Sequence, residues 1–394
     1  MGFQGLVHSL ALFLVVFGQI GRGLKSTESA VDRFKEHVER FELKFSSENE
    51  YSRRHQVFQS NLKAIDAHNS NLHKSYTMGV NKFTHLTREE FIASLGYGKT
   101  YVKGKLDLTE AKSKKVPDAE RTRSLQTKEL SGLDEYLDWS SVANPKNAVA
   151  VTPVKNQGSC GASWAFAATG ALEGAYLVKY GKLPYEETAS PDTGFIGLSE
   201  QELLACEQIN GGCFVGGAPQ YGFMYAADNG GLTSEVEVPY TSGTTPTDVG
   251  YCGNFSPDPD TATNPDKPFS TVPPTVLAMM NAVSIGPVAI TINAMNDAFQ
   301  SYNFGTISDA SLCPAGDTQH NALLVGWGTD ENFTPYWIIV RFHCYRHSPC
   351  CSCLFAFCPS PPLPPTHRKT RGEVIGATKA MCTFCAVTTT SAAC

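Results

Sequence analysis

The sequence predicts an α+β fold, because helical and strand patterns occupy different parts of the chain. Residues 50–69 carry a motif whose members recur every three or four positions, which is the repeat of one helix face. An apolar run over residues 164–180 predicts a second helix. Residues 286–292 show the alternation and the β-branched side chains that are typical of a strand. Another apolar run follows His320, so strands are expected in the second half of the chain.

Length and charge limit the possible functions. The 394 residues are enough for one large core or for two lobes with accessory segments. A net charge of −6 and a charged content of 18% provide no basic surface for nucleic acid. Residues 10–17 form an apolar run that is too short to span a bilayer and suits the core of a signal peptide. We therefore expect no membrane span, and we also expect no metal and no cofactor.

Six residues share one face of the first predicted helix, with spacings of three or four positions: Glu50, Arg54, Phe58, Asn61, Ile65 and Asn69. An ordinary amphipathic helix would explain Phe58 and Ile65 as core residues. Two asparagines on the same buried face favour a functional motif, because Asn is a poor helix former and an unpaired buried amide costs free energy. A second motif, Gly79-x-Asn81-x-Phe83-x-His85, follows. Residues 99–133 are polar and Lys-rich, which is typical of an exposed, cleavable linker.

Residues 157–166 run from a Gly- and Ser-rich turn into the second predicted helix. This order puts Ser163 at a helix N-terminus, where unbonded N–H groups and the helix dipole favour negative charge. A nucleophile would be activated in such a position.

The stretch at 157–166 resembles the active-site signature of papain-like cysteine proteases, with Ser163 where the family has its nucleophilic cysteine. The two N-terminal motifs resemble those of the family's inhibitory propeptides, with His85 in place of an Asp. The resemblance covers residues 35–339. It implies a two-lobed papain-like fold, with a helical lobe and a β-barrel lobe, preceded by a helical inhibitory propeptide.

The resemblance also implies how the chain is divided. We expect a signal peptide at 1–23, an inhibitory propeptide at 24–125 and a peptidase domain at 126–339. The expected partners are polypeptide substrates and the chain's own propeptide, which would act as an intramolecular inhibitor. A precursor of this kind follows the secretory pathway, so the expected location is extracellular, lysosomal or vacuolar.

Roles for individual residues follow from the same resemblance. His320 precedes an apolar strand that ends in Gly-Trp-Gly, where the family's catalytic histidine precedes Gly-Tyr-Gly. An isolated histidine is more often structural, and this flanking motif favours the catalytic role. Gln157 would donate to the oxyanion, a role that suits a buried amide beside a helix N-terminus. The expected catalytic residues are Ser163, His320 and Gln157.

Further residues are expected to bind the substrate or to form disulfides. Gly216 and Gly217 would let a substrate strand approach the backbone, because glycine has no Cβ. Thr291 and Asn321 fall where the family lines its main specificity pocket, so an unusual substrate preference is expected. The implied disulfides join Cys160 with Cys213 and Cys206 with Cys252.

The chain departs from the family after Ile339, where Lys-Asn-Ser-Trp-Gly should follow. Residues 340–394 are instead rich in Cys, Pro and Ser, which is compatible with a disordered tail. They are also compatible with a zinc site that uses Cys382 and Cys385 together with the cluster Cys350, Cys351 and Cys353. The cysteine spacing is irregular, which disfavours zinc. The codons of residues 368–373, read from the third base of Arg368, can encode Lys-Asn-Ser-Trp-Gly. We therefore hypothesise that residues 340–394 are a retained intron followed by a frameshifted exon.

Ser163 leaves two functions open. A helix N-terminus stabilises an anion by about 2 kcal/mol at most, or about 1.5 pKa units, which is too little to ionise an alcohol. Ser163 would therefore need His320 as a general base. One function is a papain-family endopeptidase precursor with reduced or serine-type activity. The alternative is an inactive pseudoprotease or a silicatein-like binding or scaffold protein, since silicateins also carry Ser at this position.

Overall fold

The computed structural model describes residues 30–95, 133–181, 197–309 (except 246, 248, 274 and 295), 312, 320–340 (except 332) and two strands at 354–357 and 385–389. The expected signal peptide, residues 96–132, Cys313 and most of the tail lie outside the described residues. The chain divides into two compact units, Met1–Asn61 and Leu62–Cys394, with the boundary inside a helix. No helix among the described residues is long and apolar enough to cross a membrane.

The N-terminal region consists of the helices α2 (Ala30–Arg40) and α3 (Glu48–Asn69). All six residues of the first motif lie on α3, as the spacing predicts. Phe58 is buried against Phe34 of α2, with 5.2 Å between the ring centroids. Arg54 Nε lies 3.8 Å from the Glu50 carboxylate, which also accepts hydrogen bonds from Ser46.

The expectation that both motif asparagines are buried is wrong, because Asn61 is only half-buried and Asn69 is exposed. Asn69 is exposed at the last position of α3, where its amide donates to Met78 O at 2.8 Å and accepts from Met78 N at 2.9 Å. It therefore satisfies the backbone of a neighbouring strand instead of packing into the core. Ile65, four residues earlier, is buried as expected.

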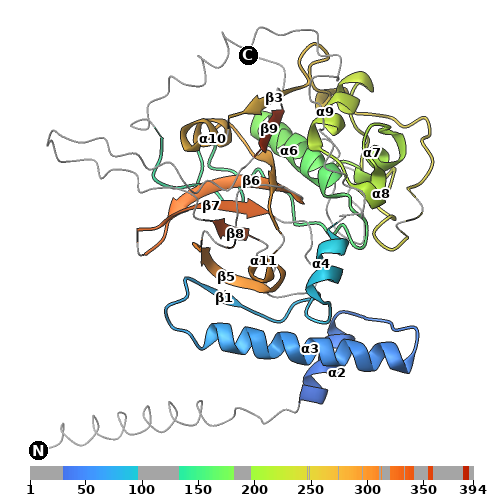
Figure 1. Ribbon diagram of the computed structural model, residues 1–394. Helices are drawn as coiled ribbons and strands as arrows, with labels where there is room; N and C mark the ends of the chain where they lie inside the picture. Colours follow the sequence, from blue (N-terminus) through green and yellow to red (C-terminus); the bar gives the residue numbers. More distant parts are fainter. Residues whose placement is uncertain are drawn as a thin grey trace, which may run out of the picture. The chain divides into compact units, whose positions relative to one another are not determined.

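The longest described helix that begins after residue 62 is α6 (Ser163–Tyr180), drawn in green in Figure 1. The others are α4 (Arg88–Ser94), α7 (Glu200–Cys206), α8 (Gly212–Val215), α9 (Pro219–Asp228), the 3₁₀ helix η3 (Pro259–Thr261), α10 (Val276–Val283) and α11 (Asp297–Ser301). Ser199 caps α7, because its hydroxyl accepts from Glu202 N at 2.9 Å.

Nine strands of the described residues are joined in one hydrogen-bonded sheet: β1 (Tyr76–Met78), β2 (Leu137–Asp138), β3 (Phe269–Val272), β4 (Val288–Ile292), β5 (Tyr302–Ile307), β6 (His320–Thr329), β7 (Pro335–Val340), β8 (Leu354–Phe357) and β9 (Cys385–Thr389). Their order is β1-β5-β8-β7-β6-β4-β9-β3, and β2 pairs with β6. The two strands from the tail, β8 and β9, therefore pair with strands of the main body.

The expectation of a β-barrel lobe needs correction, because the sheet is open in the part of the chain that the structure describes. Its two edge strands, β1 and β3, have three and four residues and do not pair with each other. A barrel closes only when its first and last strands pair with a consistent stagger.

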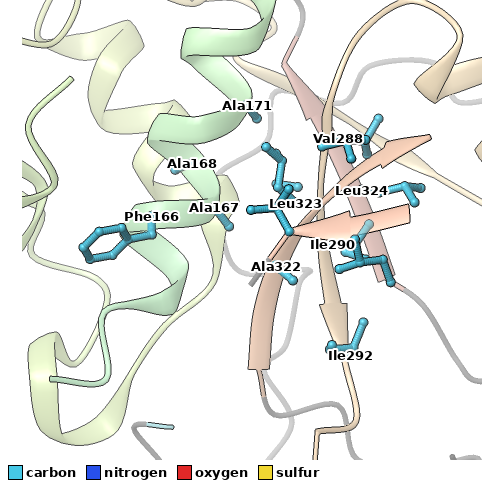
Figure 2. Packing of buried hydrophobic residues seen from close by; sticks show 14 of the residues in the cluster. Phe166, Ala167, Ala168, Ala171, Val288, Ile290, Ile292, Ala322, Leu323 and Leu324 are labelled. Carbon is cyan, nitrogen blue, oxygen red and sulfur yellow. The ribbon is translucent and has the colours of Figure 1, made fainter. Parts of the chain in front are cut away.

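The main hydrophobic core lies between α6 and the sheet. Figure 2 shows Ala167 and Ala171 of α6 facing Leu323 of β6, while Phe166 points away from the sheet. Ala167, Ala171 and Leu323 are all nearly inaccessible to solvent. The small side chains on this face let the helix approach the sheet closely, so the start of α6 is held against the start of β6.

Candidate active site

Ser163 is the first residue of α6 and is 3% exposed. The preceding residue, Ala162, has no side-chain acceptor for the first N–H groups of the helix. Ala165 N donates to Ala162 O at 2.8 Å, so the N–H groups of Ser163 and Trp164 are the ones that could serve a ligand. The turn before the helix is held by the Cys160–Cys213 disulfide and by a 2.9 Å hydrogen bond from Gly161 N to Cys213 O. This disulfide and the Cys206–Cys252 disulfide join the same cysteine pairs that the family resemblance implies.

Gln157 lies in the same turn and is fully buried. Its Nε2 donates to Cys160 O at 2.8 Å, and its backbone carbonyl accepts from the Tyr240 hydroxyl at 2.7 Å. Its Oε1 is buried and has no hydrogen-bond partner among the described residues. One of the two amide hydrogens is used by Cys160, so the other is the one that could serve a ligand.

His320 is the first residue of β6 and is also fully buried. It pairs with Ile292 of β4, and the Phe299 ring meets its imidazole edge-on at 6.0 Å between centroids. The next residue, Asn321, donates its backbone N–H to Ser163 Oγ at 3.3 Å. The fold thus brings the start of β6 directly against the start of α6, although the two are far apart in the sequence.

Asn321 connects three other residues that the sequence singles out. Its Nδ2 donates to Ser163 Oγ at 3.2 Å and to Gly217 O at 3.0 Å. Its Oδ1 accepts from the Thr291 hydroxyl at 3.1 Å, since β4 and β6 pair Thr291 opposite Asn321. These predicted site residues therefore form one hydrogen-bonded cluster.

The two glycines of the predicted substrate strand have different constraints. Gly216 follows α8 with a φ of 73°, a left-handed conformation that favours glycine. A Cβ on Gly217 would lie 2.1 Å from Asn210 Oδ1, so no larger residue fits without a shift. Gly217 is exposed, which leaves its backbone accessible.

A buried charge cluster beneath the site was not predicted from the sequence. Lys155 Nζ lies 2.6 Å from Glu200 Oε1 and 2.8 Å from Glu173 Oε1, and both glutamates are fully buried. Burial raises the pKa of Glu200 to about 7, against the opposing Lys155 ammonium. The only sequence signal was charged residues inside otherwise apolar segments, which is too weak to pair them across the chain.

Comparison with known proteins identifies the family of this chain. A model of the papain family cysteine proteases matches residues 133–341, and a model of the cathepsin propeptide inhibitor domain matches residues 34–91. Procathepsin L of Rattus norvegicus is 33% identical over 300 residues, which are 74% of this chain and 77% of that protein. Fruit bromelain of Ananas comosus is 31% identical over 313 residues, which are 78% of this chain and 75% of that protein.

Solved structures agree with these matches. A recombinant stem bromelain precursor has a TM-score of 0.66 and 26% identity, and the alignment covers 92% of this chain and 98% of that one. The digestive procathepsin L 3 of the Tenebrio molitor larval midgut has a TM-score of 0.65 and 26% identity, with 91% and 98% covered. The fold is therefore that of a peptidase preceded by an inhibitory propeptide. The chain belongs to the papain family of cysteine proteases, as a precursor with a cathepsin-type propeptide inhibitor domain.

Proposed function

We propose that the chain is the precursor of a peptidase in which Ser163 is the nucleophile and His320 its general base. The observation that carries the proposal is the hydrogen bond from the residue after His320 to Ser163 Oγ, at the N-terminus of α6. It supports a nucleophile and a base that approach each other in a buried place. Because a helix terminus cannot ionise an alcohol, proton transfer to His320 takes the place of a preformed thiolate.

The reaction follows from these roles. Ser163 Oγ bonds to the carbonyl carbon of the peptide while its proton passes to His320. The C–N bond then breaks as His320 gives that proton to the departing amine. Water repeats the sequence on the acyl ester and restores the Ser163 hydroxyl. The second amide hydrogen of Gln157 and the N–H groups at the start of α6 would stabilise the oxyanion.

The proposed substrates are polypeptides. The exposed backbone at Gly217 supports strand-like binding, and the polar pair Thr291 and Asn321 supports a specificity pocket that differs from an apolar one. The propeptide domain supports an enzyme that is kept inactive until it is cleaved. Together with the disulfides, it supports passage through the secretory pathway to an extracellular, lysosomal or vacuolar location.

Hydrolysis of a fluorogenic peptide by the processed protein tests the proposal. We expect slow hydrolysis that is lost in Ser163→Ala and in His320→Ala, and faster, thiol-dependent hydrolysis in Ser163→Cys. If Ser163→Cys is active while the parent protein is not, the site is intact but the parent is a binding or scaffold protein, and the proposed serine chemistry is wrong.

A further inference from the structure

The side-chain amide of Asn321 is held in one orientation by its partners. Gly217 O can only accept a hydrogen bond, so the NH₂ group must face it and not the amide oxygen. The Thr291 hydroxyl then donates to Oδ1, and the second Nδ2 hydrogen points to Ser163 Oγ. Asn321 is only 4% exposed, so this arrangement is shielded from competing water.

Contacts with Asn321 also use both lone pairs of Ser163 Oγ. A hydroxyl oxygen has two lone pairs, and Ser163 Oγ accepts from both the backbone N–H and the side-chain amide of Asn321. Attack on a carbonyl needs one of these lone pairs. The backbone donor belongs to β6, which pairs with both β4 and β7, so it cannot leave without breaking the sheet. The side-chain donor can leave by rotation about χ1 and χ2.

We propose that Asn321 is a latch that closes the site while no substrate is bound. Its amide caps Ser163 and occupies the Gly217 carbonyl, and an entering polypeptide displaces it. The inference rests on the function proposed above for Ser163 and Gly217. An N–H of the polypeptide replaces the N–H of Asn321 at Gly217, so the exchange leaves no acceptor unpaired there. Proline has no backbone N–H, so a substrate with proline at that position should open the latch poorly.

A thiol reporter tests the latch without requiring an active serine. In the full chain with Ser163→Cys, iodoacetamide alkylation at position 163 is followed by mass spectrometry of the peptide that contains it. Adding Asn321→Ala should speed alkylation about tenfold, because losing a hydrogen bond of ordinary strength changes an equilibrium by that order. Adding Thr291→Val, which removes only the anchor of Oδ1, should give a smaller increase of about threefold.

Controls separate the latch from a general loosening of the fold. Asn303→Ala, at an exposed position of β5, should leave alkylation at position 163 unchanged. Unchanged or slower alkylation with Asn321→Ala would overturn the proposal, as would an equal increase in all three variants.

A double-mutant cycle tests the contact itself. Ser163→Ala, Asn321→Ala and their combination are unfolded by denaturant in the full chain, and we expect coupling of about fivefold in the unfolding equilibrium constant. Additive effects would show that the two residues do not interact. If both latch tests succeed and the parent protein with Ser163 shows no hydrolysis, the latch is supported and the proposed serine chemistry is wrong. If both latch tests fail and the parent protein hydrolyses the peptide, the serine chemistry is supported and the latch is wrong.

Discussion

Lys155 Nζ and Glu200 Oε1 lie 2.6 Å apart, and the Glu200 side chain is fully buried. Glu200 also accepts from the Thr169 hydroxyl at 2.6 Å, and its Oε2 is buried without a partner among the described residues. Glu173 and, at 4.0 Å, Glu235 face the same ammonium. Lys155 thus interacts with the carboxylates of three glutamates. Two of these contacts connect the segment around Lys155 to α6 and α7.

This cluster predicts that stability depends on pH. Burial is the main cause that raises the pKa of Glu200 from 4.5 to about 7, with Glu235 and Glu173 adding to it against Lys155. Between these values the folded chain holds a proton on Glu200 that the unfolded chain releases. The contribution of Glu200 to stability is therefore fully present below pH 4.5 and is lost as the pH rises towards 7.

Denaturant unfolding between pH 4.5 and 8 measures this dependence, with Glu200→Gln as the matched variant. Gln keeps an acceptor for Lys155 and Thr169 but does not titrate. The difference in unfolding free energy between the two proteins should change with pH over this range. A constant difference would show that Glu200 does not titrate there.

Gln300 is predicted to hold the second propeptide motif. The side-chain Nε2 of Gln300 donates to Phe83 O at 3.2 Å and to Leu86 O at 3.1 Å. The backbone carbonyl of Gln300 accepts from Asn81 Nδ2 at 2.7 Å. Gln300→Ala removes the donor of two carbonyls, so hydrogen exchange of the amides at 79–95 should speed up about tenfold.

Gln56→Ala, which changes an exposed glutamine of α3, is the control and should leave that exchange unchanged. Equal protection of residues 79–95 in Gln300→Ala and in the parent would mean that Gln300 does not hold the motif.

Local patterns in the sequence predict much of the fold. The apolar run of α6 and the alternation in β4 each depend on neighbouring residues, so a short stretch is enough to predict them. The exposure of Asn69 could not be predicted, because helical spacing assigns a residue to a face of the helix but does not reveal that the helix ends at Asn69. The open sheet could not be predicted either, since closure depends on which edges pair.

The contacts of the site lie beyond local patterns. Asn321 meets Thr291 through the register of β4 and β6, and it meets Gly217 through a turn that a disulfide holds. The resemblance to a family predicts that these residues are near one another. It does not predict that Asn321 would bond to Ser163, because that bond depends on the particular side chain present.

The tail gives a prediction at the level of the transcript. The family match ends at residue 341, and β7 ends at Val340, where the sequence begins to depart from the family. The codon of Val340 can open an intron that closes at the second base of Arg368. The frame that follows permits Lys-Asn-Ser-Trp-Gly, and further on it permits a cysteine across the codons of Ser391 and Ala392.

Sequencing of the spliced messenger RNA checks this, with genomic DNA as the control. We expect the codon of Ile339 to be followed directly by codons for Lys-Asn-Ser-Trp-Gly. A message that encodes residues 340–394 as written would contradict the hypothesis.

Labelling with a fluorophosphonate tests the central claim most directly, because the reagent reacts only with a hydroxyl that a nearby base activates. Site-resolved mass spectrometry of the processed protein should find the label on Ser163 and not on the half-buried Ser140. His320→Ala should reduce that labelling at least about a hundredfold, the order that a general base contributes. An unlabelled Ser163, or labelling that does not depend on His320, would contradict the account.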